Sequence, residues 1–501
     1  MTSTEPPARP YGSRRALLAE LASTDDRRRK LTVVVVMLGV LMAAVDTTIV
    51  VLALPAMERS LHISMADVIW VIIGYVLTVT ILATQVGRLG DMFGRARMYE
   101  LGFLVFVIGS ALCASAASEA TIVGFRLLQG LGGAFLTANS GAVLADAFPA
   151  EQRGRAFGYN SIGWNIGAIL GILLGGLLIT YASWRWIFWI NVPTGLFALG
   201  LAAAVLRDTR SAARQPLDLS GMALLGTGLF GVLWAMTRLT TSSLSVGTLA
   251  WLVGGAASLG VFVLVEHGRR APMVDLRLFR IPTLAPTLLA ALFQGLANFA
   301  VLYLVLMYLQ GVRQLSPLHA SLLLVPGYLV GGVIGPYCGR ISDRIGAIWP
   351  ATVGLGVEIA ALGIYSQLRP GTSLVTVAAA AVLNGIGAGA FMPANNAAVM
   401  KIVPGNDFGT ASGMLRTFAN VGMVLSFAVA ILVAARSISR RLAFAIFLGT
   451  TSLPRRLGAS LTTGLHAAFF ASIAFMAVAT VLSATRWLRF GSPRAAEPPK
   501  P

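Results

Sequence analysis

Charged residues are scarce in this chain. Lys, Arg, Asp and Glu make up 12% of the 501 residues, Asp and Glu together number only 20, and hydrophobic residues make up 56%. Soluble globular domains contain about 25% charged residues. The scarcity therefore excludes a water-soluble protein and predicts an all-α polytopic membrane protein, in which every backbone polar group is satisfied within a helix.

Cysteine and histidine are also rare, with two and four residues. Both cysteines, Cys113 and Cys338, fall within long apolar runs, so no disulfide framework is indicated. The sequence contains no phosphate-binding loop, no zinc-ligand spacing and no suggestive order of Ser, His and Asp. We therefore expect no catalytic residues, no metal site and no cofactor. A membrane-embedded enzyme would need polar catalytic groups converging at one depth, and a sensor or structural membrane protein is equally unsupported.

Apolar runs bounded by Gly, Pro or Arg clusters predict fourteen membrane spans, since about 20 such residues cross a bilayer. The runs lie near 31–54, 68–86, 98–117, 121–146, 157–180, 185–206, 219–239, 246–266, 284–309, 319–339, 350–367, 373–400, 410–435 and 465–486. The polar residues 1–30 lack the apolar core of a signal peptide, so they are expected to form a cytoplasmic tail, as are residues 487–501.

The formal net charge of +18 would suggest nucleic acid as a partner of a soluble protein. Here most Lys and Arg residues fall in the segments on the side of both termini, which predicts a multi-pass inner-membrane protein with both termini inside and no nucleic-acid partner. Segment 436–464 is an exception, because several arginines fall outside. Its apolar stretch LAFAIFLG favours an interfacial amphipathic segment.

Asp46 is a carboxylate inside the first apolar run, LTVVVVMLGVLMAAVDTTIVVLALP. An ionisable group at that depth costs at least ~2.5 kcal/mol, so it normally faces a polar cavity and marks an ion or substrate path. Arg126 lies in the fourth run, and helix rise places both residues in the outer half of the bilayer. The two predict a proton-exchanging pair, with a static buried ion pair as the alternative.

Internal repetition is the next signal. GRLGDMFGR at 87–95 and GRISDRIGA at 339–347 both follow an apolar run, and 148–167 aligns with 403–422 through matched Pro, Gly and Asn residues. The second copies follow the first by about 250 residues, the length of six spans plus two inserted spans.

These features together resemble the major facilitator superfamily, in particular its fourteen-span drug/proton antiporters. The resemblance covers residues 31–486 and rests on five motifs in order: DTTIVVLALP, WVIIGYVL, GRLGDMFGRAR, RLLQGLGGA and SWRWIFWINVP. It implies a major facilitator fold of 14 transmembrane helices arranged as 6+2+6. The N-terminal half would be 31–206, the two inserted helices with their linkers 207–283, and the C-terminal half 284–486.

The resemblance also implies roles for individual residues. Asp46 and Arg126 would couple transport to protons. Asp91 would act in a latch on the cytoplasmic side, facing a helix N-terminus or the arginines of 147–156, with a solvated loop charge as the alternative. The gating-loop residues are Gly87, Asp91, Gly94, Arg95, Gly339, Asp343 and Gly346. The antiporter helix would carry Gly163, Gly167, Gly171 and Gly175, with Ile172 where the family usually has proline, and pure helix packing as the alternative.

Polar and aromatic residues on the cavity-lining spans are the candidates for substrate contact: Trp70, Tyr75, Asn165, Gln294, Asn298, Asn395 and Asn396. Glu358 is a second deep carboxylate, on a span that this fold places at the periphery. We expect it to form a structural pair rather than to transfer protons.

The sequence thus predicts a monomeric proton-coupled secondary transporter that exports amphipathic or cationic small molecules, as in multidrug efflux and antibiotic resistance. Its partners would be the small-molecule substrate, protons and the lipid bilayer, and the proton gradient would drive it without a cofactor. The alternatives are an exporter of an endogenous lipid, siderophore or self-made antibiotic, and a proton-coupled uptake symporter.

Overall fold

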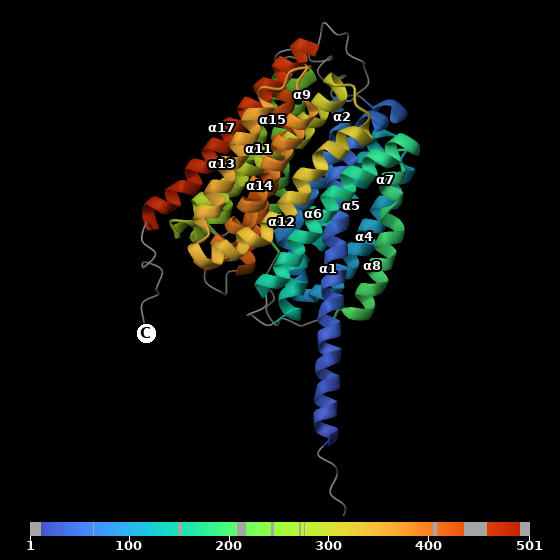
Figure 1. The fold of residues 1–501 in the computed structure, drawn as a ribbon, viewed down its shortest axis with the longest axis vertical. Helices are drawn as coiled ribbons and strands as arrows, with labels where there is room; N and C mark the ends of the chain where they lie inside the picture. Colours follow the sequence, from blue (N-terminus) through green and yellow to red (C-terminus); the bar gives the residue numbers. More distant parts are fainter. Residues whose placement is uncertain are drawn as a thin grey trace, which may run out of the picture.

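The computed structural model describes residues 12–63, 65–148, 153–207, 217–241, 245–269, 272–274, 276–403, 408–434 and 458–490. The elements in these residues are all helical, and none of them is a strand. Figure 1 shows long helices running side by side, with the first part of α1 extending below the bundle.

The helices fall into three groups along the chain. The first group is α1 (Gly12–Leu61), α2 (Met65–Val68), α3 (Trp70–Phe93), α4 (Arg95–Ser115), α5 (Glu119–Ala147), α6 (Arg153–Tyr181), α7 (Trp186–Trp189) and α8 (Asn191–Val205). The second is α9 (Leu219–Thr241) and α10 (Val246–His267), followed by the short η2 (Leu276–Arg280). The third is α11 (Leu284–Leu306), η3 (Met307–Val312), α12 (Pro317–Ile345), α13 (Ile348–Tyr365), α14 (Leu374–Ile402), α15 (Phe408–Ala434) and α17 (Gly458–Phe490).

Every predicted span coincides with a helix. Thirteen helices of the described residues are long and apolar enough to cross a membrane. At the remaining predicted span, 410–435, the structure has α15, a 27-residue helix, several of whose side chains lie outside the described residues. The protein is therefore an all-helical, multi-pass membrane protein.

Two features differ from the prediction. The helix α1 already begins at Gly12, so much of the expected tail 1–30 is helical; the Ala, Leu, Glu and Arg residues of this stretch are strong helix formers. The predicted span 185–206 is divided between α7 and α8. Residues 435–457, which hold most of the predicted interfacial segment, lie outside the described residues.

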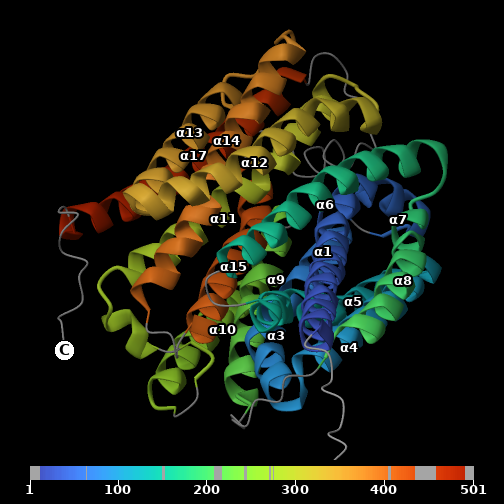
Figure 2. The same ribbon diagram turned by 60° about the horizontal axis from the view of Figure 1, so that its bottom comes forward.

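The internal repeat is visible in the helix packing. In the first group α1 packs against α6, and α5 packs against α3 and α4; in the third group α11 packs against α15, and α14 packs against α12 and α13. Figure 2 shows the two bundles beside each other. They meet where α6 contacts α12 and α3 contacts α15, while α9 and α10 pair and α9 also contacts α3 and α15.

The four regularly spaced glycines of α6 all face α1. A Cβ atom at Gly167 would lie 2.7 Å from the Leu41 carbonyl oxygen, and one at Gly171 would lie 2.8 Å from the Val45 carbonyl oxygen. Gly175 meets Ile49 and Leu52 side chains of α1, whereas Gly163 has more room. The glycines thus let the α1 and α6 backbones touch at Leu41 and at Val45, the residue before Asp46. Ile172 is fully buried within the uninterrupted helix α6.

We expect Gly171→Ala to force α6 away from α1, because its new Cβ meets Val45 backbone atoms at 2.8 and 3.0 Å. Such overpacking costs about 1–3 kcal/mol, so the thermal unfolding midpoint of the purified protein should fall. Gly200→Ala in α8 is the matched control, since nothing lies within 4 Å of its new Cβ. Equal midpoints for the two variants would contradict this packing.

Candidate functional site

Asp46 lies at the centre of a buried polar network. Its carboxylate is fully buried in α1, and the Arg126 guanidinium of α5 is only 1% exposed. Arg126 Nη1 donates to Asp46 Oδ2 at 2.7 Å, forming an ion pair. The approach expected from helix rise is therefore observed. Losing one partner of such a pair costs about 3–5 kcal/mol, because the other charge is left buried and unpaired.

Gln129 completes this network, and the sequence analysis missed it. Its Nε2 donates to Asp46 Oδ1 at 2.8 Å, while its Oε1 accepts from Arg126 Nη1 at 2.7 Å. The same Nε2 donates to Ser110 of α4, which also accepts a hydrogen bond from Asn191 of α8. The i, i+3 spacing from Arg126 puts Gln129 on the same helix face, which is the signal that identifies it within RLLQG. Four helices thus hold the pair.

Arg126 also has partners other than the carboxylate. Its Nε donates to the Val71 carbonyl oxygen at 2.7 Å, and its guanidinium lies 4.4 Å from the ring centroid of Tyr75 and 5.7 Å from that of Phe188. Arg126 would therefore keep a carbonyl, an amide oxygen and two ring faces if Asp46 became neutral. Such partners lower the cost of a change in charge at the carboxylate.

The first copy of the loop motif, residues 87–95, forms a chain of charges with the end of α5 at one end of the bundle. Asp91 pairs with Arg95 at 2.7 Å, and Arg95 also pairs with Asp146 at the end of α5. Asp91 therefore meets the first residue of α4; the side chains of the arginines in 147–156, the other expected partners, lie outside the described residues. Gly94 and Gly346 occupy matching places in the two copies, and both have positive φ, 107° and 93°. A residue with a Cβ would be strained there.

The remaining gating residues are Gly87, Gly339 and Asp343, and the two glycines lie where there is room for a side chain. A Cβ at Gly87 would meet nothing within 4 Å, and one at Gly339 would only reach Pro393 at 4.0 Å. The backbone of Asp343 is the second-copy counterpart of Asp91, but its side chain lies outside the described residues.

The substrate candidates are distributed over several places. Trp70 packs against Phe230 and Trp234 of α9, and Tyr75 lies under Arg126. Asn165 faces α12, because a Cβ at Gly332 would lie 3.4 Å from its Cβ. Asn395 accepts a hydrogen bond from Arg486 and donates to the Thr287 carbonyl oxygen, whereas Asn396 is exposed. The structure therefore joins Tyr75 to the Asp46 network and separates Trp70 from it.

Gln294 and Asn298 converge on Glu358. Asn298 Nδ2 donates to Glu358 Oε2 at 2.7 Å, and Gln294 Nε2 lies 3.3 Å from both carboxylate oxygens. Glu358 is fully buried. None of its partners in the described part of the chain is a cation, so the structural pair that Glu358 forms is with two neutral amides. The sequence could not show this, because the partners come from a different helix.

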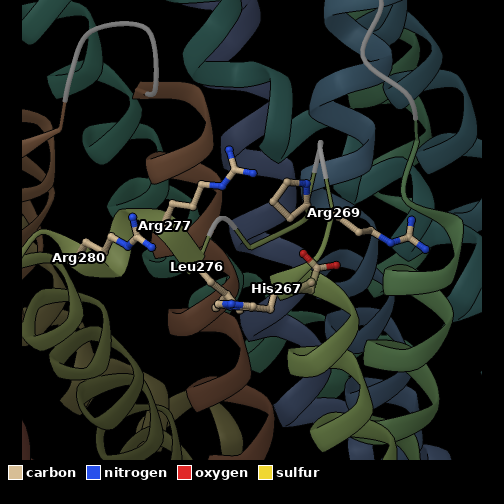
Figure 3. A pocket seen from close by; sticks show the side chains of 7 residues that line it. His267, Arg269, Leu276, Arg277 and Arg280 are labelled. Carbon is tan, nitrogen blue, oxygen red and sulfur yellow. The ribbon is translucent and has the colours of Figure 1, made fainter.

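A further charged cluster ties the inserted helices to α3. The carboxylate of Asp218 pairs with Arg269 at 2.6 Å, and the backbone N–H of Asp218 donates to the Gln85 side chain at 3.0 Å. Beside it lies a mainly basic cavity of about 230 Å³ (Figure 3). It is lined by Glu266, His267, Arg269, Pro272, Leu276, Arg277 and Arg280. These residues are distinct from the Asp46 network.

No three His, Cys, Asp or Glu side chains of the described residues lie close enough together to hold a metal ion.

Comparison with known proteins identifies the family of this chain and several of its relatives. The family described as the Major Facilitator Superfamily matches residues 36–426 and 287–501. The tetracenomycin C resistance and export protein of Streptomyces glaucescens is 32% identical over 396 residues, which is 78% of this chain and 73% of that protein. Multidrug resistance protein Stp of Mycobacterium tuberculosis is 31% identical over 78% of this chain and 73% of its own length. The riboflavin transporter RibZ of Clostridioides difficile is 28% identical over 77% and 84%.

Solved structures share the fold. The human organic anion transporter MFSD10 (TETRAN) superposes with a TM-score of 0.62 at 17% identity, covering 91% of this chain and 99% of that chain. A bacterial homologue of the human lysosomal transporter Spinster, in an inward-facing and occupied conformation, gives a TM-score of 0.58 at 19% identity, covering 91% and 97%.

We expect Gln129→Leu to lower the thermal unfolding midpoint, because Asp46 and Arg126 each lose a buried amide partner. Interhelical hydrogen bonds in membranes contribute about 1–2 kcal/mol. Gln367→Leu, which changes an exposed amide just after α13, is the control and should leave the midpoint nearly unchanged. A stable Gln129→Leu protein would show that the amide does not support the pair.

Proposed function

Since this chain belongs to the Major Facilitator Superfamily and is a transporter, we propose that it exports amphipathic or cationic small molecules in exchange for protons. One observation carries the proposal: a fully buried carboxylate in the first membrane helix, paired with a single guanidinium that has other partners of its own. A carboxylate in that setting can change its charge without leaving an arginine unsatisfied.

Electrostatics links the proton to a cationic substrate. With Asp46 ionised, the pair with Arg126 is neutral; with Asp46 protonated, it carries one positive charge. A second positive charge ~8 Å away, at an effective dielectric constant of ~20, would be destabilised by about 2 kcal/mol in the protonated state. That difference corresponds to roughly 30-fold in affinity. Protonation therefore expels a cation, and cation binding favours release of the proton.

The cycle follows from this competition. Asp46 takes up a proton from the outside, which releases the substrate there, and returns the proton to the cytoplasm, which restores the substrate-binding state. Access alternates as the two six-helix halves rock about the central site. The proton gradient supplies the energy, and no cofactor takes part.

The architecture that we propose has fourteen transmembrane helices arranged as 6+2+6, in a monomer of the bacterial inner membrane with both termini inside. The halves would be 31–206 and 284–486, joined by 207–283. Three findings support this division: a helix at every predicted span, the matched packing of the two groups of helices, and the pairing of α9 with α10. The excess of Lys and Arg on the side of the termini supports the orientation.

The names of the relatives support a drug-like substrate but also leave a second candidate. One is named for tetracenomycin C resistance and export, and another for multidrug resistance. Another is named a riboflavin transporter, which favours transport of a single aromatic metabolite in either direction. A resistance profile of a pump-deficient bacterial host that expresses this chain separates the two, because a multidrug exporter lowers sensitivity to several unrelated cations.

We further propose that the Asp91–Arg95–Asp146 cluster closes the cytoplasmic side when the cavity opens outward. The cluster joins the ends of α3, α4 and α5, so its rupture would let these ends separate. Both ion pairs are partly exposed, and such pairs contribute up to about 1 kcal/mol each. These ion pairs can therefore shift the equilibrium between the inward-open and outward-open states, but they contribute little to the stability of the fold.

We predict that Asp46→Asn abolishes gradient-driven export, because the amide cannot carry the exchanged proton. The measurement is ethidium transport by the reconstituted protein under an imposed pH gradient. Asp26→Asn on the same helix is the matched control, since Asp26 is exposed and pairs with Lys30 in its own helix. Wild-type transport by Asp46→Asn would refute the proposal, provided that the control is also fully active.

We predict that Asp91→Asn reduces turnover much more than ethidium affinity, because it shifts the population toward inward-open states. Loss of one pair worth up to about 1 kcal/mol would change that equilibrium up to about fivefold. Accessibility of a cysteine placed at Asn298, probed from each side of the membrane, reports the populations. Unchanged accessibility combined with lost ethidium binding would show that Asp91 supports the site or the fold directly.

A further inference from the structure

Glu358 is a buried carboxyl group whose partners among the described residues are neutral. It is 0% exposed on α13, and the groups that donate hydrogen bonds to it are the side-chain amides of Gln294 and Asn298 on α11. Asn298 in turn accepts a hydrogen bond from Asn384 of α14 at 3.3 Å. Three helices of the second half thus surround one carboxyl group with amides.

Within the internal repeat, this cluster is the counterpart in the second half of the Asp46 network in the first half. The segment LQGLG of α5 aligns with LNGIG of α14, so Asn384 matches Gln129. Gln129 contacts Asp46 of the first helix in its half, and Asn384 contacts Asn298 of the first helix in the other half. Each half therefore holds an amide from its fourth helix against a polar side chain of its first helix.

The glycine contacts confirm where Glu358 sits within the repeat. Gly132 of α5 packs against Phe106 of α4, and its counterpart Gly387 of α14 packs against Glu358 of α13, with a Cβ at Gly387 lying 2.5 Å from Glu358 Cγ. Glu358 in the second half thus occupies the place that Phe106 occupies in the first half, within the same four-helix arrangement.

The two sites differ in their counter-ion. Arg126 lies three residues before Gln129, and the matching residue before Asn384 is Ala381, which carries no charge. A buried carboxylate without a cation is strongly destabilised relative to its neutral acid. Its amide neighbours can donate to either form, and the oxygen of Asn384 accepts no hydrogen bond within the described residues. The setting suits a group that holds a proton while buried and loses it when water reaches it.

We propose that Glu358 is a second proton-binding site, so that each half of the transporter carries one exchangeable proton. A carboxylate oxygen of Glu358 takes a proton from hydronium in the water on one side while the site is open to that side, keeps it while the site is closed, and returns it to water when the site opens to the other side, with no other bond changed. Asn298 is half-buried, so the carboxyl group needs only a small opening to reach the surface of the bundle. The proposal deepens the proposed function and rests on it for the direction of proton flow.

The charges that face Glu358 are few. The elements packed against α13 are α14 and α17, with α11 and α12 in smaller contacts. Among the described residues of these elements, the groups that bond to Glu358 are the two amides of α11; the cation Arg486 of α17 bonds instead to Thr287, Asn395 and Ser483. A change of charge at Glu358 therefore meets no ionic partner among the described residues and favours opening of the α11–α13–α14 contact.

Infrared spectroscopy of the full-length reconstituted protein during a pH titration tests the site without any substrate. We expect a buried carboxylic acid carbonyl band that disappears as the pH rises, that is absent from Glu358→Gln and that persists in Asp46→Asn. Asn298→Leu, which keeps the carboxyl group but removes its closest donor, should move the midpoint of the same band. Spectra of Glu358→Gln that match the wild type over the whole titration would overturn the proposal.

A transport measurement tests the coupling. With the membrane potential clamped at zero and an imposed tenfold proton gradient, exchange of two protons per ethidium allows about a hundredfold accumulation, and exchange of one allows about tenfold. We expect the limit to fall from the first value to the second in Glu358→Gln. An unchanged limit would overturn the coupling. If the wild-type protein does not accumulate ethidium at all, the proposed function fails instead, and the infrared titration still decides whether Glu358 binds a proton.

If Glu358→Gln does not fold, Asn298→Leu decides by itself. A band whose midpoint responds to that change identifies Glu358 as the titrating group, and a band that does not respond overturns the assignment.

Discussion

The helix packing of the N-terminal half depends on the free-energy cost of burying a carboxylate inside an apolar bundle. Asp46 is fully buried, and at least ~2.5 kcal/mol is needed to place an aspartate at that depth even on the lenient insertion scale. Arg126 and Gln129 offset this cost, and they reach Asp46 only because α5 lies close to α1. The glycine face of α6 against α1 fixes the other side of the same helix. The packing of the bundle and the charge at its centre therefore depend on each other.

The two halves keep the same helix arrangement but distribute charge differently. Both have a fourth helix rich in glycine that packs closely against the third helix, at Gly132 and at Gly387. The first half pairs its carboxylate with a guanidinium, while the second half surrounds its carboxyl group with amides. A paired carboxylate favours the charged form and an isolated one favours the neutral form. The repeat thus provides two sites with different responses to the same proton gradient.

Much of the fold could be predicted from the sequence, because apolar run length and turn residues determine where membrane helices lie. The Asp46–Arg126 contact could also be predicted, since helix rise placed both residues in the outer half of the bilayer. Gln129 was missed because its i, i+3 spacing from Arg126 indicates a shared helix face, and that spacing alone does not distinguish an amide that binds a carboxylate from one that packs between helices. The amide partners of Glu358 and the packing of Trp70 on α9 were not predicted. Both depend on which neighbouring helix a side chain faces, and the period of a single helix cannot determine that.

The central claim is that the charge of Asp46 changes as substrate binds. Proton release on addition of ethidium to weakly buffered, purified protein measures this change directly. The account predicts that the wild type releases protons on binding and that Asp46→Asn, compared at matched occupancy, releases one proton fewer per bound ethidium. Equal release from the two proteins, with ethidium bound to both, would contradict the account.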